Sequence, residues 1–289
     1  MMNNSFQALI RLIDDPDEQV FAHVKEQLSL IGSSAIPILE TSMEDDYSVL
    51  FQNRVECLIK EIQFEETKTA LEGWIDSDEK DLLKGALIIA QYQYPSIDHQ
   101  KVIATIKELK NAIWLELSHC NTSYEKVAII NKVLFEHYEF QGNTQSFHSP
   151  INSYINTVLE LKIGNPLSLS ILYSIIAQEL NIPIYGVNLP NHFVLAYMDE
   201  YSVNPFLGKE DKYGILFYID AFSQGRIIDT KDIRDFLYQI NLTPTRACFE
   251  PCSNSQILQR MLTNLMFAYK QINNLKKVEE LRTLKNLFS

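Results

Sequence analysis

The chain contains few of the residues that form tight turns and crosslinks. Its 289 residues include 9 glycines, 10 prolines and 4 cysteines. All-β proteins need many turns built on glycine and proline, so this composition favours a helix-rich fold. The cysteines are too few for a disulfide framework, and Cys248 and Cys252 have no histidine nearby that could complete a metal site. We therefore predict no metal ion and no cofactor.

Positive charge and long apolar runs are also scarce. The 25 Lys and Arg residues face 37 Asp and Glu residues, which gives a net charge of −12, and the longest basic run is Lys276-Lys277. Because nucleic acids and anionic membranes attract clustered cations, the sequence predicts neither as a partner. No apolar run reaches the roughly 18 residues that span a bilayer, and acidic residues from Asp14 onward argue against a secretion leader. A cytoplasmic globular protein is expected.

The first 75 residues show helical periodicity in two similar units. In the first unit, Gly32 ends a helix over Val20–Ile31 and a second helix follows. The next unit begins at Asp45, and its Leu71 corresponds to Leu39 at a shift of 32 residues, within the range of paired-helix solenoids. This region resembles HEAT repeats, and an irregular helical cap on the next domain is the alternative. The apolar stripe of the helix Val20–Ile31 has no partner within such a short unit. We therefore expect this helix to dock on the core of the chain.

A buried helix is the central element of the remaining sequence. Gly164 is suited to a turn with positive φ, Asn165 is a good N-cap, and Pro166 fits the first helical position. Leucine and isoleucine then recur at helical spacing on more than one face, which indicates burial. The helix should end near Asn181, ahead of Pro183.

Three short strands are predicted after this helix, at Ile184–Val187, Phe193–Tyr197 and Leu216–Ile219. His192 opens the second strand and Asp220 closes the third. On adjacent antiparallel strands the two side chains could form a hydrogen bond, as a His and an Asp do in hydrolytic triads. We predict this bond, with both side chains lining a cleft at the start of the Pro166 helix.

Polar and helical segments surround these strands. The stretch 200–213 is expected to be an excursion between the two strands that carry His192 and Asp220, and 141–150 is expected to be a loop. Two amphipathic helices between Gln256 and Phe288 resemble a single tetratricopeptide hairpin. Their apolar stripe from Leu258 to Tyr269 is also expected to dock on the core.

The order of helix, His strand and Asp strand resembles the transglutaminase-like superfamily, whose papain-like triad is Cys, His and Asp. In that family the Cys stands at the helix N-terminus, at a fixed distance before a turn written Gly-Ile-Pro. The corresponding turn here is Asn181-Ile182-Pro183, and counting back from it places Pro166 at the Cys position. The resemblance thus implies that His192 and Asp220 are a triad remnant without its nucleophile.

More closely, the chain resembles the SirB-type bacterial branch, whose relatives also occur in F-box proteins. The resemblance runs from about Leu82 to the C-terminus and departs from the branch pattern at Asn165 for Ile, Asn191 for Gly and Ala221 for Pro. The matching segments are Asn152-Ser153-Tyr154, Gly164 to Leu169, Asn191-His192-Phe193 and Asp220-Ala221-Phe222. They imply binding residues at Asn152, Tyr154, Asn165, Ser168, Asn191 and Phe193.

Because proline has no nucleophilic atom, the family's thiol chemistry cannot start from Pro166. The favoured hypothesis is a non-catalytic interaction or regulatory protein that holds another protein or a peptide. The alternative is a hydrolase or acyltransferase in which His192 and Asp220 act with Ser170, one helical turn beyond Pro166, or with Ser168 or another nucleophile. A purely structural His–Asp hydrogen bond also remains open.

The predicted fold is therefore α+β. Residues 1–80 form HEAT-like helices, and 81–250 form a degenerate transglutaminase-like core with a small antiparallel sheet against the Pro166 helix. Residues 251–289 form the C-terminal helix pair.

Overall fold

The computed structural model describes residues 2–45, 48–118, 122–199 and 214–289, and it divides the chain into two compact units. One unit is Met1–Gly73 with Gln91–Pro95, and the other is Trp74–Ala90 with Ser96–Ser289. This division differs from the three predicted parts, because the boundary falls inside a helix and the C-terminal helix pair belongs to the same unit as the core. The predicted excursion at 200–213 lies outside the described residues.

The N-terminal unit is helical, but its described residues do not form the second of the two predicted helix pairs. Its core consists of apolar residues from α1, α2, α3 and the first part of α4, including Val24, Leu28 and Leu39. The stripe on α2 therefore finds its partner inside its own unit, contrary to expectation. Gly32 ends α2 with a φ of 70°, as predicted. The elements are α1 (Met2–Arg11), η1 (Leu12–Asp14), α2 (Glu18–Ile31), η2 (Gly32–Ala35), α3 (Ile36–Asp45) and α4 (Val49–Asp76).

The second predicted pair is wrong because α4 is one continuous helix of 28 residues. Its sequence contains no proline, and its one glycine, Gly73, stands near the end. Nothing local therefore breaks the helix between the positions that the repeat pattern assigned to two helices.

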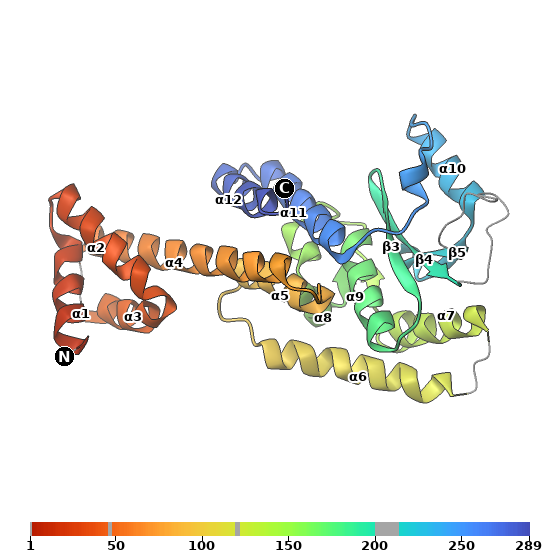
Figure 1. The fold of residues 1–289 in the computed structure, drawn as a ribbon, viewed down its shortest axis with the longest axis horizontal. Helices are drawn as coiled ribbons and strands as arrows, with labels where there is room; N and C mark the ends of the chain where they lie inside the picture. The colour runs from red at the N-terminus through yellow and green to blue at the C-terminus, as the bar shows by residue number, and fades with distance from the viewer. Residues whose placement is uncertain (1, 46–47, 119–121, 200–213) are drawn as a thin grey trace. The chain divides into compact units, whose positions relative to one another are not determined.

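Helices make up most of the second unit (Figure 1). The predicted helices after Pro166 and within 256–288 are present. Thr122 caps α7 through a capping box with Glu125. The helices are α5 (Leu82–Gln93), α6 (His99–Leu117), α7 (Ser123–Asn131), α8 (Ile155–Leu161), α9 (Pro166–Glu179), α10 (Thr230–Gln239), α11 (Asn254–Gln271) and α12 (Leu275–Asn286), with short helical segments at η3 (Lys132–His137), η4 (Pro150–Ser153), η6 (Ala221–Ser223) and η7 (Arg246–Cys248).

The main sheet has the order β3-β4-β5-β6, and all its neighbouring strands are antiparallel. Its strands are β3 (Ile184–Leu189), β4 (His192–Met198), β5 (Ile215–Asp220) and β6 (Arg226–Ile228), and a separate parallel pair is formed by β1 (Gln141–Gly142) and β2 (Ile163–Gly164). Strands β3 and β4 are joined by Pro190 and Asn191, whose φ is 58°. Asparagine tolerates this left-handed conformation, which is the physical reason that Asn can stand where the family pattern has Gly.

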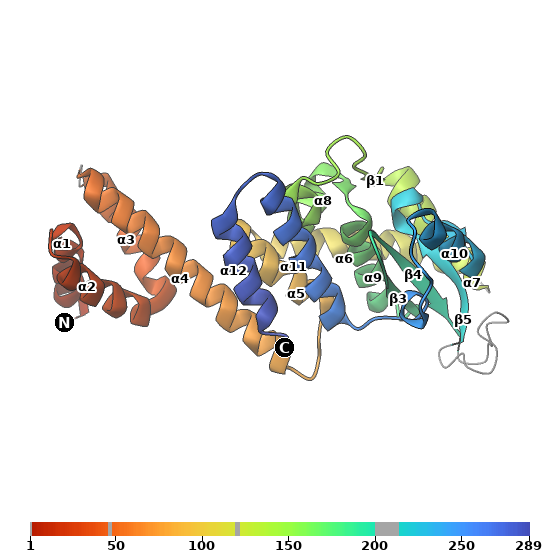
Figure 2. The same cartoon turned by 90° about the horizontal axis from the view of Figure 1, so that it is seen from above.

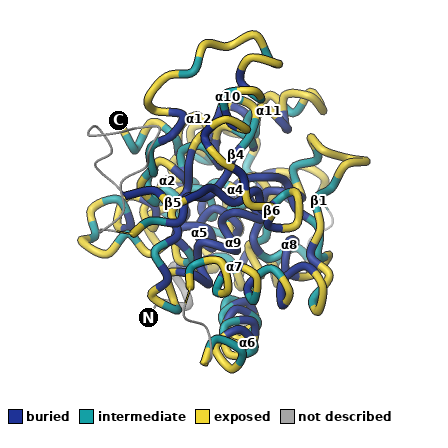
Figure 3. The backbone as a smooth tube through the Cα atoms, turned by 90° about the vertical axis from the view of Figure 1, so that its right-hand side faces the viewer, coloured by how far each residue is buried: buried dark blue, intermediate teal, exposed yellow. Residues whose placement is uncertain are grey.

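Helices cover both faces of the main sheet. One face packs on α10 and the segment that ends at Phe249, through side chains such as Val187, Val194 and Ile233. The other face packs on α9, where all residues from Pro166 to Ala177 are buried, as the tube of Figure 3 shows. Helices α11 and α12 lie side by side in Figure 2, and α11 contacts α9 and η4. The predicted α+β core and the docking of the C-terminal stripe are both confirmed.

None of the helices in the described part of the chain combines the length and the apolar character needed to cross a bilayer.

Gly164 precedes α9 for a different reason from the one predicted. It does not have a positive φ. A Cβ atom at this position would instead lie 2.7 Å from the Ser168 hydroxyl and 2.9 Å from Leu169 Cγ. The residue is therefore small because the first turn of α9 folds back closely over it.

We predict that Gly164→Ala lowers the free energy of unfolding by about 1–3 kcal/mol, because the added methyl group overpacks the first turn of α9. Gly73→Ala is the matched control. It adds the same methyl group in a helix where nothing lies within 4 Å, and it should raise stability by about 0.5–1 kcal/mol. Urea unfolding followed by circular dichroism measures both. Equal effects of the two substitutions would contradict the close-approach explanation.

Candidate functional site

The start of α9 is fixed by a reciprocal capping box. The Asn165 side chain accepts a hydrogen bond from the Ser168 amide, and the Ser168 hydroxyl accepts one from the Asn165 amide, both at 2.9 Å. The Ser168 hydroxyl also donates to the carbonyl of Asn152. Ser168 is therefore fully engaged in capping, and Pro166 follows the cap at the first helical position.

The segment Asn152-Ser153-Tyr154 connects this cap to its surroundings. The side-chain nitrogen Nδ2 of Asn152 donates to the backbone carbonyls of Ser146 (2.7 Å) and Phe147 (3.2 Å). The Ser153 hydroxyl accepts from the Asn165 side chain at 2.9 Å. The Tyr154 hydroxyl lies 3.0 Å from the Tyr269 hydroxyl on α11. Each residue of this segment thus holds a different neighbouring element in place.

His192 and Asp220 meet as predicted. The Nε2 atom of His192 lies 3.2 Å from Oδ2 of Asp220, and both side chains are largely buried. The same carboxylate accepts hydrogen bonds from the Ser223 hydroxyl at 2.8 Å and from the amides of Phe222 and Ser223. The ring of Phe236 stands 5.6 Å from the imidazole. These contacts fix the orientation of His192.

Two electrostatic consequences follow from this pair. Burial alone would raise the pKa of Asp220, but the hydrogen bonds and charge of His192, together with the bonds from Ser223, hold it below its ordinary value. Because Nε2 donates to the carboxylate, a neutral imidazole carries its proton there and presents Nδ1 as an acceptor. Nδ1 has no hydrogen-bond partner among the residues that the structure describes.

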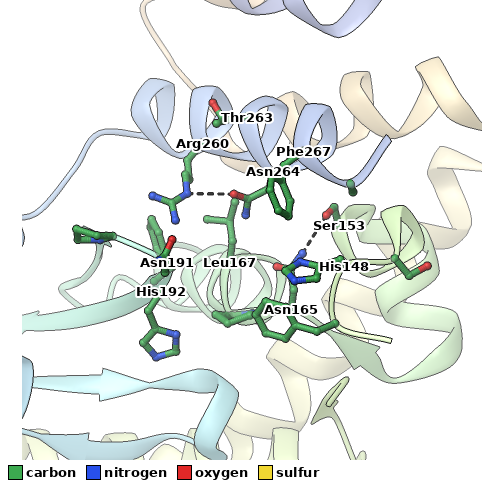
Figure 4. A pocket seen from close by; sticks show the side chains of 16 residues that line it. His148, Ser153, Asn165, Leu167, Asn191, His192, Arg260, Thr263, Asn264 and Phe267 are labelled. Atoms are coloured by element: carbon green, nitrogen blue, oxygen red, sulfur yellow. Dashed lines mark hydrogen bonds between the residues drawn. The ribbon is translucent and has the colours of Figure 1, made fainter. Parts of the chain in front are cut away.

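A pocket of about 460 Å³ opens at the start of α9, within the second unit (Figure 4). Its floor consists of residues from the start of α9 and the segment before it: Ser153, Asn165, Pro166 and Leu167. The hairpin between β3 and β4 contributes Pro190, Asn191, His192 and Phe193. A loop contributes Phe147, His148 and Ser149, and α11 contributes Arg260, Thr263, Asn264, Phe267 and Ala268.

The predicted site residues divide into two groups. Asn165, Pro166, Asn191, His192 and Phe193 line the pocket. The other five do not line it: Asn152, Tyr154, Ser168, Ser170 and Asp220. The prediction that Asp220 lines the cleft is therefore wrong, because its carboxylate contacts His192 from outside the pocket. Asn152, Tyr154 and Ser168 hold the walls in place through the bonds described above.

The alternative nucleophiles are poorly placed for chemistry in this pocket. Ser170 is fully buried, and its hydroxyl has no hydrogen-bond partner among the described residues. Cys57 is exposed in the N-terminal unit, and Cys248 is buried in the core on the other side of the sheet. Burial raises the pKa of Cys252 to about 12, so this thiol stays protonated. Cys120 lies outside the described residues.

Sequence reasoning missed the wall that α11 provides. Arg260, Thr263, Asn264 and Phe267 have the spacing i, i+3, i+4 and i+7, which places them on one face of the helix. This polar and aromatic stripe runs beside the apolar stripe that was read as a docking surface. The signal was therefore present in the sequence, but only the packing of α11 near the start of α9 identifies it as part of a site.

The arrangement of a buried helix whose N-terminus faces a His on one strand and an Asp on the next defines a papain-like class of site. The family model described as Transglutaminase-like superfamily matches residues 100–263, more than half of the chain. The protein belongs to this superfamily.

Relatives of this chain occur in bacteria and in animals. A UPF0162 protein from Xylella fastidiosa (strain 9a5c) is 29% identical over 205 residues, which cover 69% of this chain and 68% of that protein. A UPF0162 protein from Xylella fastidiosa (strain Temecula1) is 30% identical over 161 residues, covering 56% and 53%. F-box only protein 21 from Homo sapiens is 28% identical over 214 residues, covering 65% and 32%. The chain thus spans about two thirds, half and one third of these proteins. No solved structure matches it.

The lowered pKa of Asp220 predicts how stability depends on pH. A carboxylate with a depressed pKa in the folded state stabilises the fold above its unfolded pKa of about 3.9, and this contribution is lost as the pH falls through the folded value. Asp220→Asn should therefore lower the free energy of unfolding by about 1–3 kcal/mol at pH 7, through weakened hydrogen bonds to the charged group. The difference from the unmodified protein should shrink below about pH 4.

Urea unfolding between pH 3 and pH 8 measures this dependence. Asp235→Asn, which removes the same charge from an exposed site on α10, should change stability by less than about 0.5 kcal/mol at pH 7. A constant gap between Asp220→Asn and the unmodified protein over the whole pH range would show that the charge of Asp220 does not stabilise the fold.

Proposed function

We propose that this protein is a non-catalytic binding protein, acting in the cytoplasm, which uses the pocket at the start of α9 to hold a segment of another protein or a peptide. The observation that carries the proposal is the composition of the pocket. Among its described lining residues there is no cysteine, and the first residue of α9 is Pro166. A papain-like site without a nucleophile can bind and orient a ligand but cannot form an acyl-enzyme.

The hydroxyl groups of Ser153 and Thr263, two of the pocket's lining residues, support the same proposal. Ser153 accepts a hydrogen bond from Asn165 and is almost fully buried. Thr263 donates to the carbonyl of Gln259 in its own helix. In Figure 4 both residues stand away from the His192 ring. A serine or threonine needs a base within hydrogen-bond reach to become a nucleophile, and neither contacts one here.

Size and surface chemistry favour a ligand of modest dimensions. About 460 Å³ falls within the usual range of small-ligand pockets. Phe147 and Phe267 are 37% and 48% exposed, so apolar rings remain available to a ligand side chain. His192, fixed by Asp220, offers Nδ1 as a hydrogen-bonding atom of defined position. Helix α11 serves in this proposal as one wall of the binding site, and α12 packs against α11.

The competing hypothesis is a hydrolase or acyltransferase that uses the His192–Asp220 pair with another nucleophile. One observation favours it, namely that the pair keeps the geometry of a general base held by a carboxylate. The same set of experiments distinguishes the two hypotheses.

We predict that the unmodified protein shows no turnover of model amide or glutamine-containing peptides, and that His192→Ala leaves this result unchanged. In Pro166→Cys, a thiol would stand at the N-terminus of α9 in the same pocket as His192. These surroundings lower a thiol pKa and increase its thiolate fraction at pH 7. Alkylation by iodoacetamide should therefore be roughly tenfold or more faster than for a free cysteine.

Thr263→Cys is the matched control, because it places a thiol in the same pocket on α11, away from both His192 and the start of α9. Mass spectrometry of the modified peptides separates the introduced thiols from the exposed Cys57. Equal alkylation rates at positions 166 and 263 would mean that the pocket lacks the electrostatics of the superfamily. Turnover by the unmodified protein that disappears in Ser170→Ala would overturn the non-catalytic proposal.

A further inference from the structure

The pocket contains a cation that has no acidic partner among the residues whose structure is described. Arg260 lies on the α11 wall, where its Nη1 donates to the Asn188 side chain at 2.7 Å and its Nε donates to Asn264 at 3.1 Å. A guanidinium has five N–H groups, so three remain without a partner among the described residues. No carboxylate within the described chain forms an ion pair with Arg260, although the protein carries 37 acidic residues.

The surroundings of Arg260 leave its positive charge partly desolvated and not neutralised, so an anionic ligand would be bound favourably. The side chain is partly buried, and burial lowers the pKa of Arg260 from its ordinary value. Its two acceptors are neutral amides, which orient the guanidinium without neutralising it. Two histidines, His148 and His192, are the other titratable groups of the described lining, and that lining contains no aspartate or glutamate. The pocket is therefore a cationic site on a protein with a net charge of −12.

Polar and apolar groups occupy different ends of the pocket. In Figure 4, Arg260 and Asn191 are drawn toward one side of the pocket, and Phe267 and His148 toward the other. The rings of Phe267 and His148 stand 5.1 Å apart, and His148 is also 5.1 Å from Phe147. A ligand that satisfies both ends needs an anionic group and an apolar group close together.

We propose that Arg260 binds the free carboxylate at the C-terminus of a peptide or protein, and that the aromatic end of the pocket takes the apolar side chain next to it. A carboxylate matches the planar fork of a guanidinium and can accept two parallel hydrogen bonds from it. The amide nitrogen of Asn264, which has no acceptor among the described residues, is a further donor beside it. This inference rests on the proposed binding function and specifies its ligand.

The test compares two peptides that differ only in the end group. Isothermal titration calorimetry of the full chain uses acetyl-alanyl-alanyl-phenylalanine as the free acid and as the C-terminal amide. The free acid should bind roughly ten- to hundredfold more tightly, because the amide removes the charge and one acceptor. In Arg260→Gln this ratio should fall to near one.

Two further variants control for charge and for folding. Arg226→Gln removes the same charge from an exposed position on β6, outside the pocket, and should retain the preference for the free acid. Arg260→Lys keeps the charge but loses the fork, and should give an intermediate ratio. Because the acid and amide are compared on the unmodified protein, the test does not depend on whether a variant folds.

Each outcome has a defined meaning. Equal binding of acid and amide would overturn the carboxylate assignment while leaving the pocket as a binding site. Binding of inorganic phosphate, with no binding of either peptide, would assign Arg260 to a phosphate ligand and overturn the proposal. The absence of any binding would also overturn it. Cleavage of the amide during the titration would instead refute the proposed non-catalytic function on which the inference rests.

Discussion

Hydrogen bonds from three consecutive residues, Asn152 to Tyr154, hold the separate walls of the pocket together. Asn152 holds the loop that carries Phe147, Ser153 holds the cap of α9, and Tyr154 holds α11 through its hydroxyl. All three side chains are buried, where an unmade hydrogen bond costs more than a made one contributes. Loss of one bond would therefore release one wall rather than rearrange the whole core.

The His192–Asp220 pair gives this pocket its chemical character. The carboxylate is saturated by donors from His192 and from the turn after β5, so it fixes the ring and does not reach the ligand space itself. Pro166 stands at the N-terminus of α9. In the proposed binding function, the oriented imidazole is a fixed hydrogen-bonding group for the ligand. Arg260 adds a cation on the opposite wall.

Local signals in the sequence were sufficient to predict the helix and strands that build the site. The Asn165 cap, Pro166 at the first helical position and the strands bearing His192 and Asp220 each follow from short-range physical preferences. Features that depend on longer stretches of sequence could not be predicted from such local preferences. A 32-residue similarity suggested two helices where α4 is continuous, because a repeat pattern carries no information about where a helix breaks.

The composition of the pocket was only partly predictable for a related reason. The motif residues Asn152 and Tyr154 were expected to bind a ligand, whereas they position the walls, and Arg260 and Phe267 were not identified. Which residues face a pocket depends on how α11 packs near the start of α9. That packing is a tertiary property, set by contacts between segments far apart in the sequence, such as Tyr154 with Tyr269, which are 115 residues apart.

Hydrogen–deuterium exchange of Asn152→Ala would test most directly whether these bonds hold a preformed pocket. The account predicts faster exchange confined to the loop at 143–149, whose carbonyls and Asn143 side chain bond to Asn152. The sheet and α10 should keep the exchange of the unmodified protein. Asn156→Ala is the control on the adjacent helix, since its side-chain oxygen is buried without a partner among the described residues. Unchanged exchange in the loop, or faster exchange throughout the unit, would contradict the account.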